Sequence, residues 1–281
     1  MEDLYSRIKI VPLQQCLSHE GIVERWVDQI AFNILNEGVM KNPVIVTYHD
    51  PYYVVLDGMH RYAAIKQLGV GDILACEVDY FSDKIGLEGW DALVFQKLEA
   101  KKFLENLFPP SEGYTLRAAR NVEEALSLVR NRKTLLAVLD RQGECWLLDK
   151  GGMEKVGVES LCVAADRIDR SLHEKGLKTV YVDNSLTLKD WPGSDAQSLI
   201  LRPQFTKQEV IERTLHQKLF PPKSTRHLIP ERPLRVDLDL SLLRASIDLE
   251  TKNRVLKDHL KWCYENNRVR YYPESVHIFA D

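Results

Sequence analysis

The sequence predicts a mixed α+β or α/β protein of two domains. Its 281 residues are 44% hydrophobic and 28% charged, which is typical of a folded globular chain. Because a domain usually holds about 100–200 residues, this length suits one large or two smaller domains. Strand-like and helical runs alternate both before and after Pro109-Pro110, which favours two. We expect an N-terminal domain over 1–86, a connecting helix over 87–110 and a second mixed α/β domain over 111–281.

The charge and cysteine content exclude several classes of protein. Thirty-eight basic residues against 41 acidic ones give a formal charge of -3, so no global basic field holds the molecule on nucleic acid. The five cysteines are scattered and form no CxxC pair, so neither a zinc site nor a disulfide framework is indicated. No apolar run of 18 residues occurs and the N-terminus is charged. We therefore expect a cytoplasmic protein without a signal peptide or membrane anchor.

The N-terminal domain is predicted from periodicity and turn residues. Four apolar residues spaced four apart define the expected buried face of an amphipathic helix that Gly38 ends: Ile22, Trp26, Ile30 and Ile34. Two β-rich runs around His49-Asp50-Pro51 predict a hairpin. The expected elements are, in order, strand 7–12, turn 17–21, the amphipathic helix, hairpin strands 44–48 and 52–56, turn 57–61, helix 62–68 and strand 73–81.

Beyond the hairpin domain, the run WDALVFQKLEAKKFLENL predicts a long helix over 89–108 that Pro109 ends. Strand-like runs then alternate with helical ones, as in a second α/β unit. The expected strands are 114–118, 134–140, 144–148, 179–183 and 198–201, and the expected helices are 122–130, 160–173 and 207–220.

The first candidate site is the segment DGMHR, Asp57 to Arg61, between a buried strand and a helix. Backbone N–H groups at a helix N-terminus favour an anion, and Gly58 lets the backbone approach that anion closely. Arg61 and His60 can add donors, and Asp57 could hold Mg²⁺ or orient a hydroxyl. The pattern indicates a phosphate site. The alternative is that Asp57 only caps the helix and Arg61 is a solvated residue.

The second candidate is the basic cluster in PPKSTRHLIPERP: Lys223, Ser224, Thr225, Arg226 and His227. Three potentially cationic side chains and two hydroxyls within five residues can clamp an anion. The flanking prolines reduce the entropy lost on ordering the segment, so it is poor material for a flexible linker. The alternative is a solvated basic surface loop.

The third candidate is the turn Ser18-His19-Glu20. A carboxylate that accepts a proton from a hydroxyl must lie beside the transferring group, and a loop at the mouth of a small α/β domain can place it there. The alternative is that Glu20 merely complements a helix dipole. Trp90 is a candidate for the wall of the substrate site, and the alternative is that it is a core residue. Glu24, one helical turn later, is a weaker candidate for the base.

The common nucleotide and hydrolase motifs are absent from the sequence: GxxxxGK[ST], GxGxxG, GxSxG and HExxH. The eight histidines lack the spacing of a zinc or non-haem iron site. Any phosphate site must therefore use a less common fold.

The order of VPLQQCLSHE, an amphipathic helix, NPVIVTYHDPYYVVLDGMHRYAAIKQLG and a strand resembles the ParB/sulfiredoxin superfamily domain, over about residues 7–82. The DGxHR form, the HE pair and the C-terminal PPKSTRH resemble the free L-serine kinases. This family includes the archaeal ADP-dependent enzyme and the bacterial enzymes of siderophore clusters that make O-phospho-L-serine. The resemblance implies a ParB/sulfiredoxin-like N-terminal domain followed by a second mixed α/β domain.

The resemblance also implies roles for residues. Glu20 matches the family's catalytic glutamate and Asp57 its catalytic aspartate next to metal and phosphate. Trp90 and His227 correspond to the substrate side. The implied nucleotide- and phosphate-binding residues are Gly58, Met59, His60, Arg61, Lys223, Ser224, Thr225, Arg226 and His227. Met59 stands where relatives often have histidine and where sulfiredoxins use cysteine, which excludes sulfinic-acid reduction.

The function that the resemblance implies is phosphorylation of free L-serine with ATP or ADP and Mg²⁺. Partition-type ParB proteins carry a GERR-like arginine box and a helix-turn-helix, and neither is evident here. The alternative is a ParB-like nucleotide-binding transcriptional regulator that binds DNA or haem. We expect L-serine and nucleotide as partners, disfavour DNA, and expect no membrane.

Overall fold

The computed structural model describes residues 2–151, 156–185 and 187–272. The chain divides into two compact units, one from 1–16, 24–78 and 232–281 and the other from 17–23 and 79–231. The segment after residue 231 thus packs with the N-terminal strands rather than with the segment before it. The predicted division into a domain over 1–86, a connecting helix over 87–110 and a domain over 111–281 stays a prediction.

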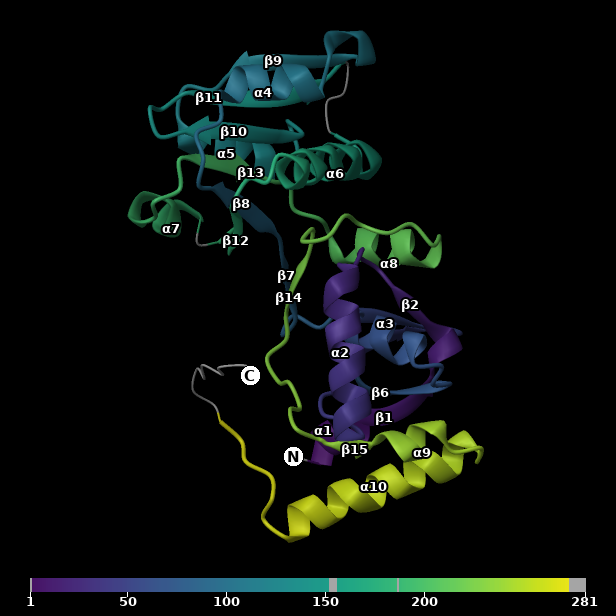
Figure 1. Ribbon diagram of the computed structural model, residues 1–281. Coiled ribbons are helices and arrows are strands. Elements are labelled where there is room, and N and C mark those ends of the chain that lie inside the picture. Colours follow the sequence, from purple (N-terminus) through teal and green to yellow (C-terminus); the bar gives the residue numbers. More distant parts are fainter. Residues whose placement is uncertain (1, 152–155, 186, 273–281) are drawn as a thin grey trace. The chain divides into compact units, whose positions relative to one another are not determined.

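A five-stranded mixed sheet forms the centre of the first unit (Figure 1). Its order is β1-β6-β4-β5-β2, with β4 and β6 parallel and the pairs β1–β6 and β4–β5 antiparallel. Helices α2 and α3 contact each other, and α10 packs along β1. The strands are β1 Ile8–Pro12, β2 Cys16–Ser18, β4 Val44–His49, β5 Tyr52–Asp57 and β6 Asp72–Glu77, and the helices are α1 Glu2–Arg7, α2 Glu24–Glu37, α3 Met59–Gln67, α9 Leu240–Arg244 and α10 Leu249–Glu265.

The predicted buried face of the amphipathic helix was partly wrong. Helix α2 begins at Glu24 and buries Val27, Ala31 and Ile34. These residues follow the spacing i, i+4, i+7 of one helical face, which shares only Ile34 with the expected row. Ile22 precedes the helix, and Trp26 is 53% exposed because it lies outside the face that carries Val27, Ala31 and Ile34.

The predicted hairpin and the strand–turn–helix after it are confirmed. Strands β4 and β5 pair from His49 and Tyr52 back toward Ile45 and Asp57. Strand β5 ends at Asp57, and α3 begins at Met59. The interior of β5 is fully buried, so the DGMHR turn stands at the end of a core strand.

The second unit has a six-stranded antiparallel sheet in the order β12-β8-β13-β10-β11-β9 (Figure 1). Every residue of β10 and β13 is buried, so both faces of the sheet centre are covered. Helices α4, α5 and α6 contact β10. The strands are β8 Trp90–Val94, β9 Tyr114–Ala118, β10 Leu136–Asp140, β11 Cys145–Lys150, β12 Thr179–Asp183 and β13 Ser198–Leu201, and the helices are α4 Ala100–Leu107, α5 Val122–Arg130, α6 Val158–Glu174, α7 Thr187–Gly193 and α8 Lys207–Leu215.

The predicted helix over 89–108 was half wrong. Residues Trp90–Val94 form β8, which pairs with both β12 and β13, and the helix begins only at Ala100. Local helix propensity here yields to strand pairing on both sides. The buried Asp91 can lie in this strand because it pairs with Arg130 and accepts hydrogen bonds from Thr187 and the Arg202 amide.

Several smaller elements were not predicted. A two-stranded ribbon joins β7 Gly86–Glu88 to β14 Arg226–Leu228, and another joins β3 Val39–Met40 to β15 Leu238–Asp239. Helix α8 ends at Leu215, five residues earlier than expected, and helices α9 and α10 were missed. In the part of the chain that the structure describes, no helix has the length and apolar character needed to span a membrane.

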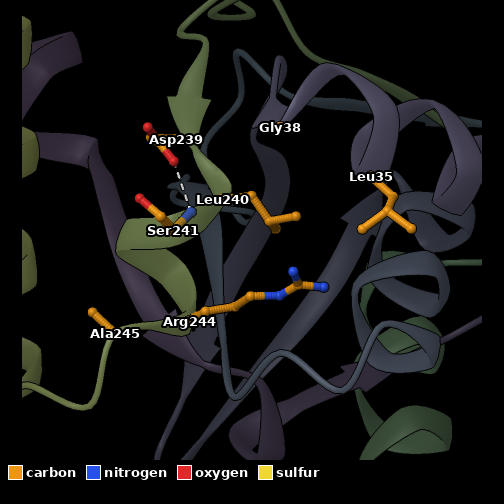
Figure 2. A pocket seen from close by; sticks show the side chains of 7 residues that line it. All are labelled: Leu35, Gly38, Asp239, Leu240, Ser241, Arg244 and Ala245. Atoms are coloured by element: carbon orange, nitrogen blue, oxygen red, sulfur yellow. Dashed lines mark hydrogen bonds between the residues drawn. The ribbon is translucent and has the colours of Figure 1, made fainter.

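A shallow pocket of about 400 Å³ lies on the first unit, between α2 and α9. Figure 2 shows the Arg244 side chain extending from α9 toward Leu35. Its lining residues are Leu35, Gly38, Asp239, Leu240, Ser241, Arg244 and Ala245. None of the site residues predicted from the sequence is among these lining residues.

Candidate active site

Glu20 lies in the second unit, in a short bridge to the segment that follows α8. The Phe220 amide donates to the carbonyl oxygen of His19 at 2.8 Å, and the Gly21 amide donates to that of Phe220 at 2.9 Å. Two backbone hydrogen bonds thus hold Glu20 next to Phe220, which lies 200 residues later in the chain and directly precedes the PPKSTRH segment. This pairing has no signal in the local sequence.

The carboxylate of Glu20 accepts three hydrogen bonds from that segment. The Lys223 amide donates to Oε1 at 2.7 Å, and Thr225 donates to Oε2 from its amide at 3.0 Å and from its hydroxyl at 2.7 Å. An ionised carboxylate has about four acceptor sites, so these donors leave one for a further partner. A hydroxyl that must give up its proton fits that remaining site. We call Glu20, Lys223 and Thr225 the Glu20 cluster.

Two buried histidines lie next to the Glu20 cluster. The Thr225 hydroxyl, whose single proton goes to Glu20, lies 2.7 Å from Nε2 of His19, so the histidine nitrogen is the donor in that contact. The rings of His19 and His227 meet edge to face at 5.0 Å between centroids. His227 Nε2 lies 2.9 Å from the hydroxyl of Tyr80, whose pKa is raised by burial. A buried polar chain therefore backs the carboxylate.

Trp90 contacts the same segment. Its indole N–H donates to the carbonyl oxygen of Thr225 at 3.0 Å, and Lys223 Nζ lies 5.3 Å from its ring centroid. Such a cation–π contact orients both groups. Ser224, which lies between Lys223 and Thr225 in the sequence, is buried, and its hydroxyl has no hydrogen-bond partner among the described residues. A buried hydroxyl of that kind usually binds water or a ligand.

Arg226 points to two carboxyl groups. It is the cross-strand neighbour of Glu88 in the β7–β14 ribbon, contacts that carboxylate at 3.0 Å and also pairs with Asp183. Burial and the hydrogen bond with Asp183 raise the pKa of Glu88. Burial opposes ionisation of Asp183 too, but hydrogen bonds from Glu88 and Ser185 lower the pKa of Asp183 below its ordinary value. Sequence reasoning missed both acids, which give no local motif.

The first unit holds Asp57 between two arginines. Asp57 Oδ2 accepts from Arg61 at 3.3 Å and from Arg232 at 2.8 Å. Arg61 also donates to the carbonyl oxygens of Asn42 and Pro43 at 3.1 and 2.8 Å. Burial lowers the pKa of Arg61, Asp57 opposes this effect, and the nearby charge of Arg232 adds to it. We call Asp57, Arg61 and Arg232 the Asp57 cluster. Arg232 was not predicted as a site residue.

The start of helix α3 requires a glycine. Gly58 has a φ of +90°, and a Cβ there would lie 2.8 Å from Nη2 of Arg61 and 3.0 Å from a methyl group of Val44. Glycine is therefore needed both for its backbone conformation and for the room it leaves. Met59 and His60 are the first two residues of α3, and both are half-buried. Met59 has no side-chain donor, so only its backbone amide can bind an anion.

The described residues contain no group of three or more His, Cys, Asp or Glu side chains arranged to hold a metal ion. Mg²⁺ is often bound through one or two carboxylates together with substrate phosphates. The single carboxylate of Asp57 at a helix start fits such a donor set. The structure thus places Glu20, Trp90 and Lys223 to His227 together in the second unit, and Asp57 to Arg61 in the first.

The chain is similar over most of its length to known L-serine kinases. No protein-family profile matches the chain. It is 28% identical over 239 residues to an ATP-dependent L-serine kinase of Staphylothermus marinus, covering 84% of this chain and 90% of the relative. An ADP-dependent L-serine kinase of Thermococcus kodakarensis is 23% identical over 247 residues, 83% of this chain and 91% of the relative. A ParB-like protein of Sulfolobus acidocaldarius is 23% identical over 222 residues, with 79% and 90% covered.

Two solved structures share the fold. A free serine kinase variant in complex with AMP has a TM-score of 0.71 at 20% identity, covering 84% of this chain and 93% of that one. SbnI with a C-terminal truncation from Staphylococcus aureus has a TM-score of 0.71 at 17% identity, covering 94% and 100%. The expected resemblance to the free L-serine kinases and the predicted fold class are therefore confirmed.

Proposed function

We propose that this protein is a kinase that phosphorylates the hydroxyl of free L-serine with ATP or ADP. The observation that carries the proposal is the match, over 84% and 83% of the chain, to curated L-serine kinases that use ATP and ADP. In the reaction, the serine oxygen bonds to the terminal phosphorus while the bond from that phosphorus to the bridging oxygen breaks. The hydroxyl proton passes to a base, and the products are O-phospho-L-serine and ADP or AMP.

Glu20 is the proposed base. Its carboxylate is held by three donors and has one acceptor site left for the serine hydroxyl. Because the donors come from a segment stiffened by prolines, the carboxylate keeps its position before substrate arrives. The buried chain through Thr225 and His19 fixes the orientation of the Thr225 hydroxyl.

The start of α3 is the proposed phosphate site. The first amides of the helix, the His60 side chain and the guanidinium of Arg61 are the donors that would face phosphate oxygens. Gly58 provides the room for Arg61. Asp57 would hold Mg²⁺ together with the nucleotide phosphates, and the ion would offset phosphate charge during transfer.

Trp90, His227 and the basic loop are the proposed substrate side. Trp90 is fixed by its hydrogen bond to Thr225 and by the contact with Lys223. The hydroxyl of Ser224, buried without a partner among the described residues, is a further group that substrate or water would satisfy. Lys223 and Arg226 bring positive charge to anionic groups of serine or phosphoserine.

The test is direct detection of the product. Purified protein is incubated with L-serine, Mg²⁺ and either ATP or ADP, and phosphorus NMR follows the appearance of phosphoserine. Parallel reactions omit serine, to reveal nucleotide hydrolysis, or contain a chelator, to test the Mg²⁺ requirement. We expect phosphoserine with at least one donor. Binding of nucleotide without phosphoserine from either donor would contradict the proposal.

A further inference from the structure

The second arginine on Asp57 has a specific setting in the first unit. Arg232 Nη1 donates to Asp57 Oδ2 at 2.8 Å, the same oxygen that Arg61 contacts at 3.3 Å. Asp57, Arg61 and Arg232 together carry one net positive charge, since two guanidinium groups face one carboxylate. The N-terminus of α3 and two arginines can therefore bind an anion with more negative charge than the single carboxylate of Asp57.

The backbone near Arg232 is fastened to the turn that holds Arg61. The Arg235 amide donates to Oδ1 of Asn42 at 2.8 Å, and the Asp237 amide donates to the Lys41 carbonyl oxygen at 3.1 Å. The carbonyl oxygen of the same Asn42 accepts from Arg61 at 3.1 Å. One turn therefore contacts both Arg61 and the backbone three residues beyond Arg232. Pro233 further restricts the backbone of Arg232 to extended conformations.

The two arginines differ in how firmly they are held. Arg61 has 24% of its side chain exposed and donates to two backbone carbonyl groups, so its position is set by the fold. Arg232 is 38% exposed and Asp57 is 36% exposed, so their ion pair is largely solvated. An ion pair of this kind contributes only about 0–1 kcal/mol. Losing the Arg232–Asp57 ion pair would therefore cost little.

We propose that Arg232 is a phosphate-binding residue of the proposed phosphate site at the start of α3. When the nucleotide binds, the Arg232 guanidinium gives up its contact with Asp57 and binds the phosphate oxygens of the nucleotide instead. This inference rests on the proposed function, because it names a further ligand of the same nucleotide. The exchange forms a guanidinium–phosphate contact and releases Oδ2 of Asp57 from one of its two arginines. Asp57 is then less neutralised and better able to bind a cation that accompanies the phosphates.

The test is calorimetric binding of ADP and ATP to wild type and to three variants, with the fold of each checked by circular dichroism. Arg232→Ala should weaken ADP binding about tenfold or more, the loss expected for one charged hydrogen bond. Arg232→Gln keeps a shorter donor and should lose less. Arg235→Ala is the matched control, since its side chain is 71% exposed and pairs with Asp237 rather than Asp57. Its ADP affinity should stay within about twofold of wild type.

The outcomes separate this inference from the proposed function. If wild type binds neither ADP nor ATP, the proposed function itself is wrong. If wild type binds ADP and Arg232→Ala binds it equally well, Arg232 is not a phosphate ligand. An equal loss in Arg235→Ala would also overturn the inference, because it would trace the loss to the segment's conformation. Should Arg232→Ala be unfolded, the comparison of Arg232→Gln with Arg235→Ala decides the question by the same criteria.

Steady-state kinetics can distinguish a phosphate contact of Arg232 from a merely structural role, because a structural role would not change the KM for one substrate alone. Arg232→Ala should raise the KM for nucleotide about tenfold while leaving the KM for serine within about twofold. A parallel rise in both KM values would contradict a specific phosphate contact.

Discussion

The hydroxyl and the backbone amide of Thr225 both donate to one oxygen of the Glu20 carboxylate, at 2.7 and 3.0 Å. One residue thus supplies two of the three donors that hold the proposed base. Both residues are buried, so neither contact is exchanged readily for water. The orientation of Glu20 therefore depends on a threonine that no catalytic motif would single out.

Replacing Thr225 with valine should weaken both stability and activity. Valine keeps the shape of threonine but leaves Glu20 Oε2 and His19 Nε2 without the hydroxyl, at a cost of about 1–3 kcal/mol in the free energy of unfolding. We expect kcat to fall about tenfold or more as Glu20 loses its orientation. Thr225→Ser, which retains the hydroxyl, is the control. Denaturant unfolding and phosphoserine formation measure the two effects, and equal activity of the two variants would contradict the role of the hydroxyl.

Glu20→Gln should abolish most of the turnover without unfolding the protein. An amide cannot accept the serine proton, so kcat should fall about 10²–10⁴-fold, the usual contribution of a general base. Nucleotide affinity should persist. Glu24→Gln is the matched control, because Glu24 is exposed at the first position of α2. Near-wild-type turnover in Glu20→Gln would show that another group is the base.

Gly58→Ala should weaken nucleotide binding beyond its effect on stability. The new methyl group would lie 2.8 Å from Arg61 Nη2, and the φ of +90° disfavours any side chain by about 1–2 kcal/mol. Gly69→Ala is the matched control, since Gly69 has a φ of +67° but open space around a Cβ. Both variants should lose stability, whereas only Gly58→Ala should lose about tenfold in ADP affinity. Equal ADP affinity in the two variants would remove Arg61 from the phosphate site.

The carboxyl pair Glu88–Asp183 should make stability depend on pH. Burial and the hydrogen bond to Asp183 raise the pKa of Glu88, so the folded state holds a proton that the unfolded state releases above about pH 4.5. Stability should therefore fall as pH rises from that value through the raised pKa. Glu88→Gln keeps a donor for Asp183 and removes this titration.

Thermal unfolding of wild type and Glu88→Gln from about pH 4.5 upward, where this linkage acts, measures the effect. The Tm of Glu88→Gln relative to wild type should rise with pH. A constant difference between the two melting temperatures would show that Glu88 does not hold a proton in the folded state. The pKa of Asp183 is lowered, so Asp183 has the opposite effect on stability. Its stabilising contribution is lost as pH falls through that lowered pKa.

Local pattern alone determined the hairpin at residues 44–57, the strand–turn–helix of DGMHR and the helix Val122–Arg130. In these segments turn residues, alternation and caps agree with the final fold, as in the Asn121 side chain that caps α5. The same agreement made Asp57 and Arg61 visible as a site. The PPKSTRH segment stood out through its charge and prolines, although its partners did not.

Only the tertiary structure decided the remaining relationships, because they join residues far apart in the chain. Strand β8 exists because β12 and β13 pair with it on both sides, a condition that the local sequence of Trp90–Val94 does not reveal. The contacts of Glu20 with Thr225, of Arg226 with Asp183 and of Asp57 with Arg232 are likewise non-local. Sequence identified which side chains can carry charge and protons, whereas packing determined which of them meet.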